Sequence, residues 1–295
     1  ASFRKRLDRT LLPSEECRGR GWTIDWSKDP PRKSPKFLGT RIERNIPLEK
    51  IIPFIDWSPF FMAWELTGKY PSIFSDKSIG LEAKRLFDDG QQLLDEIISK
   101  QWLRAHSVWG FFKANSDRDD VIIKDDQGNE VTRFHMLRQQ WERKVEAGVA
   151  RFRCLSDYIA PLESGLADHL GAFAVTAGDG AEELDKRFIA EHDDYKGIMA
   201  KALADRLAEA LAEYQHLLAR KQWYAENESL GNEDLIAERY EGIRPAPGYP
   251  SCPDHTEKSI LWDLLKAEKN IGVRLTESFA MSPAASVSGF YFGHA

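Results

Sequence analysis

The sequence predicts an α+β fold with a mixed or antiparallel sheet flanked by helices. Two observations favour this class. The strand-like segments are joined by connections of varied length, whereas a parallel sheet requires a regular alternation of strands and helices. Two segments, 78–100 and 181–223, repeat apolar residues every three to four positions, which is the period of an amphipathic helix.

The first 45 residues are expected to form an extended lead-in that packs on the body of the protein. Three prolines between residues 30 and 35 oppose regular structure in this segment. The stretch 46–64 is apolar and aromatic, and Pro53 and Pro59 interrupt any long helix within it. We therefore expect a short helix, a turn and a second short helix there.

The remaining elements follow from periodicity, turn residues and capping signals. Asp254 and Glu257 have the spacing of a capping box, which predicts a helix that ends before Gly272. The stretch 242–250 contains three prolines and two glycines, and it is expected to be a fixed loop. The other predicted helices are 78–100, 134–145, 181–223 and 234–240. Strands are predicted at 107–112, 121–124, 170–176, 273–281 and 286–292.

Charge, hydropathy and cysteine usage exclude several classes of protein. The chain carries 41 basic and 47 acidic residues, and a net charge of −6 argues against a nucleic-acid-binding protein. No apolar run reaches the roughly 18 residues that a transmembrane helix needs, so no membrane association is expected. Cys17, Cys154 and Cys252 are odd in number and far apart, which favours free thiols and a cytoplasmic location.

Three short motifs have a functional and a structural interpretation. Gly178-Asp179-Gly180 follows a predicted strand, but Glu183 stands where a dinucleotide-binding loop has its third glycine, so a simple turn is favoured. The run His192-Asp193-Asp194 points its side chains in different directions if it is helical, which disfavours a metal site. Cys252 and His255 are spaced like two zinc ligands, but no second pair lies nearby in the sequence.

The loop around Arg244 is the most informative stretch for binding. A guanidinium in a proline-rich loop suits a bidentate contact with a carboxylate or phosphate. Gly248 lets a ligand approach the backbone, and Tyr249 offers an aromatic face to an adenine or a sulfonium. Asp56, the only charge between Pro53 and Trp64, suits an ammonium group. The structural alternatives are an N-cap for Asp56 and a salt bridge for Arg244, and spacing alone does not separate them.

Several blocks of sequence carry a family resemblance. They are 54–61 (FIDWSPFF), 68–71 (GKYP), 192–195 (HDDY), 201–210 (KALADRLAEA), 242–250 (GIRPAPGYP) and 275–281 (LTESFAM). Together, from about Trp26 to the end of the chain, they resemble the C-terminal activation domain of cobalamin-dependent methionine synthase. The most specific element is R-x-x-x-G-Y, which is Arg244 to Tyr249 in this chain.

The resemblance implies a single curved, C-shaped domain over residues 46–295 that binds S-adenosylmethionine (AdoMet) and lacks a Rossmann fold. By this resemblance, Asp56 holds the amino group of the ligand and Arg244 holds its carboxylate. Ala246, Gly248 and Tyr249 supply loop contacts, and Glu209 lies close to the ligand. Members of the family continue to a further aromatic pair that touches the ligand, so the C-terminal part of the domain is expected to lie beyond Ala295.

The family role is repair. The resemblance implies reductive methylation of cob(II)alamin to methylcobalamin with the AdoMet methyl group, which supports methyl transfer to homocysteine and formation of methionine. The implied partners are the cobalamin-binding domain of the same polypeptide and a flavodoxin or flavodoxin-like methionine synthase reductase. No catalytic side chain or metal is expected in this part, and the fragment alone is not expected to perform the full reaction. The alternatives are a free-standing AdoMet-dependent methyltransferase for a small molecule and a non-enzymatic docking module.

Overall fold

The computed structural model describes residues 11–142 and 150–294. Within them, the helices are α2 (Ser14–Gly19), α3 (Ser58–Met62), α4 (Gly80–Ser99), α5 (Ala181–Ala190), α6 (Asp194–Gln222), α7 (Asn232–Ile236), α8 (Glu257–Leu265) and α9 (Ala267–Ile271). The strands are β1 (Gly39–Ile46), β2 (Arg104–Asp117), β3 (Asp120–Lys124), β4 (Glu130–His135), β5 (Asp168–Asp179), β6 (Arg274–Leu275), β7 (Met281–Ser282) and β8 (Ser286–Tyr291). Short 3₁₀ turns η1 (Leu48–Lys50) and η2 (Ile52–Phe54) precede α3.

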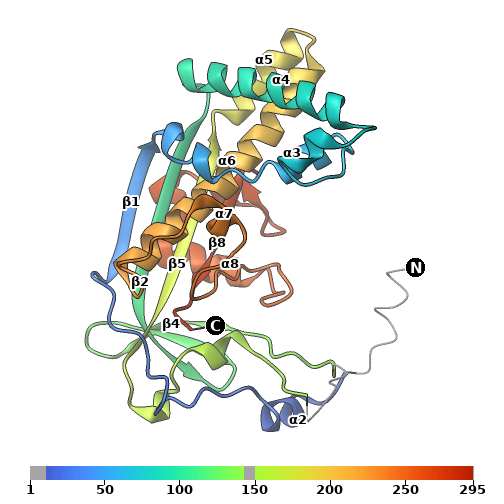
Figure 1. Cartoon of the computed structure of the whole chain (residues 1–295). Helices are drawn as coiled ribbons and strands as arrows, with labels where there is room; N and C mark the ends of the chain where they lie inside the picture. The colour runs from blue at the N-terminus through green and yellow to red at the C-terminus, as the bar shows by residue number, and fades with distance from the viewer. Residues whose placement is uncertain (1–10, 143–149, 295) are drawn as a thin grey trace.

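The main sheet confirms the predicted α+β class. It has six strands in the order β4-β3-β2-β5-β8, with β1 added beside β2, and every pairing is antiparallel. The long strand β2 pairs with β1 along its first half and with β3 along its second half. In Figure 1 the helices at one end and α2 at the other project to the same side of the sheet, so the molecule is curved.

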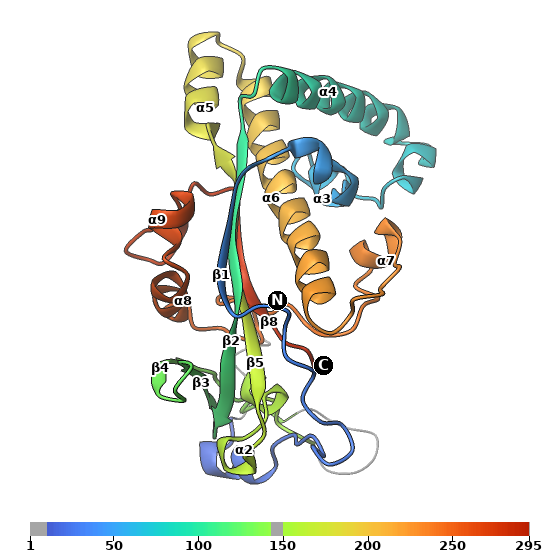
Figure 2. The same ribbon diagram turned by 90° about the vertical axis from the view of Figure 1, so that its left-hand side faces the viewer.

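Helices cover both faces of the sheet and create two cores (Figure 2). Helices α4 and α6 lie on one side, and α8 and α9 lie on the other. Strand β5 contributes to both, because Phe173 and Val175 belong to one buried cluster and Ala172 and Ala174 to the other. Successive side chains of a strand point to opposite faces, and this alternation explains why almost all of β5 is buried.

Two predictions of secondary structure in the first half of the chain are wrong. Residues 39–46 belong to β1 instead of an irregular lead-in, since this strand is largely exposed and its polar residues hide the strand pattern. The helix predicted at 134–145 is absent from the described residues. Phe134 is fully buried in β4 opposite Val121, and residues 143–149 lie outside the described residues.

The segment 181–223 is two helices instead of one. His192 has a φ of 56°, which ends the helical path between α5 and α6. Asp193 then starts α6, because its side chain accepts a hydrogen bond of 3.0 Å from the backbone N–H of Lys196. Residues 192–194 are therefore the junction between two helices and not a face of one continuous helix.

We expect Asp193→Ala to lower the free energy of unfolding by about 1 kcal/mol, the usual cost of removing an N-cap. Asp193→Asn retains an acceptor at the same position and should stay close to the unsubstituted protein. Urea denaturation followed by circular dichroism measures both changes. Equal loss in the two variants would show that the charge, and not the cap, stabilises the start of α6.

The C-terminal region also differs from its prediction. Asp254 accepts hydrogen bonds from the backbone and side chain of Thr256, while Glu257 reaches His135 on β4, so the two form no capping box. The predicted helix breaks at Lys266, whose φ is 49°, into α8 and α9. The predicted strand 273–281 is a small hairpin in which β6 pairs with β7. Strand β8 is confirmed at the edge of the main sheet.

Candidate functional site

The loop that carries Arg244 is tied to the end of β8. Ile243 and Phe292 exchange two backbone hydrogen bonds of 3.2 and 3.1 Å, and Phe290 donates to the carbonyl of Pro245 at 2.9 Å. Gly289 permits this approach, because a Cβ at that position would lie 2.6 Å from the Pro245 carbonyl oxygen. The backbone of the loop is thereby fixed to the sheet.

Arg244 forms a buried ion pair with Glu213 of α6. Its Nη2 lies 2.9 Å from Glu213 Oε2, and the two side chains are only 17% and 9% exposed. Burial raises the pKa of Glu213, while Arg244 and Arg220 oppose that increase. Burial acts to lower the pKa of Arg244, but Glu213, together with Tyr240, Tyr291 and Glu209, outweighs it and leaves the pKa raised, so Arg244 stays a cation.

The pair and its neighbour Tyr291 contain three polar atoms without a partner among the described residues. Arg244 Nη1, Glu213 Oε1 and the hydroxyl of Tyr291 are all buried without a hydrogen-bond partner in the described part of the chain. An unpaired buried donor or acceptor costs about 1–3 kcal/mol, so such atoms are rarely left together in a core. Their grouping around one cation suits the binding of an additional anion or polar ligand.

Asp56 lies between η2 and α3 and is half-buried. Its Oδ1 accepts a hydrogen bond of 2.9 Å from the backbone N–H of Ser58, the first residue of α3. Among the described residues, none donates to Oδ2. The N-cap residue of α3 is Trp57, so Asp56 is not the N-cap itself, although one of its oxygens binds the first N–H of the helix. Its other oxygen has no hydrogen-bond partner among the described residues, so the contact with Ser58 does not exclude a ligand contact.

Helix α6 brings these two parts of the sequence together. Tyr214, the neighbour of Glu213, packs its ring 5.5 Å from the ring of Phe54, and Asn232 donates a hydrogen bond of 2.9 Å to the carbonyl of Pro53. The segment before Asp56 and the Arg244 loop thus rest on adjacent residues of α6. Figure 2 shows α3 beside the middle of this helix.

The remaining residues singled out in the sequence lie on the loop or on α6. Ala246 is half-buried, and its carbonyl accepts a hydrogen bond of 3.2 Å from the N–H of Tyr249. Tyr249 is 61% exposed. Gly248 has a φ of 100° and donates to the carbonyl of Cys252 at 2.7 Å. Glu209 is exposed on α6, and its charge favours the protonated form of Arg244.

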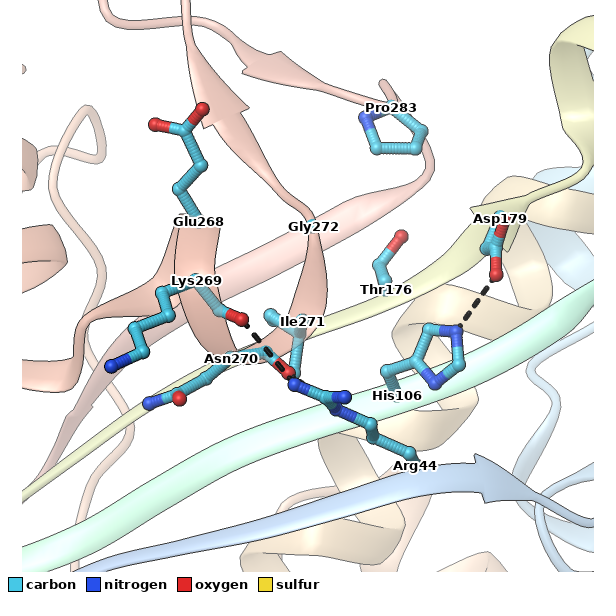
Figure 3. A pocket seen from close by; sticks show the side chains of 10 residues that line it. All are labelled: Arg44, His106, Thr176, Asp179, Glu268, Lys269, Asn270, Ile271, Gly272 and Pro283. Carbon is cyan, nitrogen blue, oxygen red and sulfur yellow. Dashed lines mark hydrogen bonds and ion pairs between the residues drawn. The ribbon is translucent and has the colours of Figure 1, made fainter.

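Two cavities of similar volume differ in whether the buried polar groups beside them have partners. One of about 330 Å³ is bordered by Tyr240, Arg244 and Pro245 and adjoins the buried ion pair. Another of about 380 Å³ lies between the sheet and α9 (Figure 3). In the latter, His106 Nδ1 accepts from the N–H of Asn45, and its Nε2 faces Asp179 at 2.9 Å. Its buried polar groups already have partners, which makes the Arg244 cavity the better ligand site.

Comparisons with known proteins identify the family of the chain. The sequence model of the family "Vitamin B12 dependent methionine synthase, activation domain" matches residues 47–295. The chain belongs to this family. Among solved structures, it is similar to the MetH reactivation domain bound to AdoHcy, with 48% sequence identity and a TM-score of 0.91. That similarity covers 96% of this chain and 87% of the other.

In this activation domain, sequence reasoning missed Glu213. The signal was present, because Glu209, Glu213, His216 and Arg220 are spaced by four, three and four residues and therefore share one face of α6. Polar residues on a face that is otherwise apolar indicate a buried polar network. The periodicity of this helix was assigned from its apolar members, and Glu209 entered the sequence prediction only through the family resemblance.

Two observations show why Gly248, the glycine of the R-x-x-x-G-Y element, suits its position in this domain. Its φ of 100° is strained for other residues, and a Cβ would lie 2.3 Å from His255 Cε1. We expect Gly248→Ala to lower the free energy of unfolding by at least the ~1–2 kcal/mol of a left-handed non-glycine residue. Thermal unfolding monitored by fluorescence measures this loss.

Gly128→Ala is the matched control for Gly248→Ala. Gly128 has a φ of 88°, and nothing lies within 4 Å of its added Cβ, so this variant reports backbone strain alone. Gly248→Ala should be the more destabilising variant, and His255→Ala should recover the difference. Equal losses at the two glycines would contradict a steric role for His255.

The described residues hold neither a candidate metal site nor a candidate membrane span. Within residues 11–142 and 150–294, no group of three or more His, Cys, Asp and Glu side chains could hold a metal ion, so Cys252 and His255 form no zinc site there. In the same part of the chain, none of the helices is long and apolar enough to cross a membrane.

Proposed function

We propose that this activation domain binds AdoMet across α6, with Arg244 holding the carboxylate of the ligand and Asp56 its ammonium group. The observation that carries this proposal is the buried, unpartnered Nη1 of Arg244, which a carboxylate would satisfy. The free Oδ2 of Asp56 offers the complementary charge. The similar MetH reactivation domain was solved with AdoHcy, which differs from AdoMet only in lacking the methyl group and its positive charge.

The rest of the ligand would lie along the proline-rich loop. Gly248 allows close approach to the backbone, and the exposed ring of Tyr249 is available for stacking or for contact with a cation. Ala246 supplies backbone contacts, and Glu209, one turn before Glu213, faces the same region from α6. These residues position the ligand, and none of them needs to act as an acid or a base.

The chemistry of AdoMet explains why positioning suffices. When bound, AdoMet supplies an activated methyl group on a sulfonium, and the acceptor is the cobalamin carried by another domain of the same polypeptide. Fixing both ends of the amino-acid moiety orients that methyl group, which is an entropic contribution to the rate. The electron for reductive methylation would come from a flavodoxin or a flavodoxin-like reductase. The three free, buried cysteines are compatible with a reducing cytoplasm.

The test has two stages. Isothermal titration calorimetry of the 295-residue chain should show binding of AdoMet, and absence of binding would favour a docking module. Adding the cobalamin-binding domain and reduced flavodoxin should then produce an AdoMet-dependent loss of the cob(II)alamin absorbance. Methyl transfer to another small molecule without cobalamin would favour a free-standing methyltransferase.

A further inference from the structure

Helix α6 carries a stripe of buried polar side chains on the face that meets the Arg244 loop. Glu213 is 7% exposed, and His216 and Arg220 are fully buried. Their spacing of three and four residues places them one above another. Burial of several polar side chains beside the Arg244 loop costs free energy unless they pair with one another or with another polar group.

Glu213 is the member of the stripe that touches the loop. Its Oε2 takes one N–H of Arg244 Nη2 at 2.9 Å, while its Oε1 and Arg244 Nη1 have no partner in the described residues. A guanidinium is planar and rigid, so a bond to Nη2 fixes the direction of Nη1 as well. Glu213 thus sets the orientation of the donor that a ligand would use.

The surroundings of Glu213 are themselves rigid. The ring of His216 stacks on Tyr291 at 5.0 Å and meets the edge of Tyr240 at 4.7 Å. Arg220 lies over the Tyr240 ring at 4.1 Å and binds Glu228 at 2.8 Å, so it forms a second buried pair farther along the helix. The charge of Arg220 also favours the ionised form of Glu213.

We propose that Glu213 is the positioning residue of the ligand site, which holds the Arg244 guanidinium so that Nη1 is directed at the carboxylate of AdoMet. This inference rests on the proposed function, since it takes Arg244 as the carboxylate-binding residue. Glu213 itself need not touch the ligand. A substitution of Glu213 should therefore lower the affinity only for a ligand that carries the carboxylate.

The test compares two probes by calorimetry, AdoMet and decarboxylated AdoMet, on the 295-residue chain. Glu213→Gln preserves the size of the side chain but removes the charge that holds Arg244. We expect it to weaken AdoMet roughly tenfold, as is typical of coupled charged pairs, and to change the affinity for decarboxylated AdoMet less than about twofold. Glu213→Asp keeps the charge but is one methylene shorter, so it should also weaken AdoMet selectively.

Glu228→Gln is the matched control, because it also neutralises one half of a buried ion pair on α6. It should lower the melting temperature but leave the affinity for AdoMet unchanged. Unaltered or tighter AdoMet binding in Glu213→Gln, or equal loss of both probes, would overturn the inference. Failure of the unsubstituted chain to bind AdoMet would instead overturn the proposed function, so the two failures are distinguishable.

Discussion

Arg244→Ala should abolish measurable binding of AdoMet and lower the free energy of unfolding by about 3–5 kcal/mol, the usual cost of breaking a buried ion pair from one side. The variant leaves Glu213 buried and only 9% exposed, without the cation that lies 2.9 Å away. Chemical denaturation measures the stability, and calorimetry with AdoMet measures the affinity.

The stability deficit of Arg244→Ala should depend on pH. Burial already raises the pKa of Glu213, and loss of Arg244 removes a charge that opposes this increase. A folded-state pKa above the unfolded value means that folding is favoured by protonation, so stability is lost as pH rises through the folded pKa. The deficit should therefore be smaller at pH 5 than at pH 8, and a deficit independent of pH would argue against an uncompensated Glu213.

Arg244→Lys separates charge from shape. Lysine keeps a cation near Glu213 and should recover part of the lost stability. A single ammonium cannot reproduce the planar arrangement in which Nη2 binds Glu213 and Nη1 binds the ligand, so AdoMet affinity should remain poor. Unchanged affinity in this variant would show that only the charge of Arg244 matters.

Asp56→Asn should weaken AdoMet by roughly 1.5–3 kcal/mol, the range for a hydrogen bond to a charged group. Asparagine keeps the oxygen that accepts from the N–H of Ser58, so the start of α3 is preserved. The substitution removes the negative charge that would hold the ammonium of the ligand. Calorimetry gives the change in affinity, and thermal unfolding should show little change in stability.

Asp76→Asn is the control for this prediction. Asp76 accepts a hydrogen bond of 2.8 Å from the N–H of Ser78 in the same local arrangement just before α4. It lies outside the ligand site, so its substitution should leave the affinity for AdoMet unchanged. An unchanged dissociation constant in both variants would show that Asp56 serves the helix alone.

The candidate site was only partly predictable from the sequence. Asp56 was recognisable as an isolated charge in an apolar stretch, and Arg244 as a cation in a proline-rich loop. Glu213 was not recognised, because its partner is 31 residues away and no periodicity specifies which side chain a loop will meet. The tertiary contacts also decide which individual oxygen or nitrogen atoms remain unpartnered and could meet a ligand.

By itself, the sequence determined the elements whose signals are local. Residues close together in the sequence predict the apolar period of α4, the buried strand β5 and the proline-fixed loop at 242–250. Ordered blocks of residues indicated the family. Only the tertiary structure decided the break between α5 and α6 at His192, the assignment of 39–46 to β1 and the pairing of Arg244 with Glu213. The physical reason is that these features depend on contacts between residues far apart in the chain. Hydrogen bonds to β2 stabilise β1, and burial between α6 and β8 stabilises the ion pair.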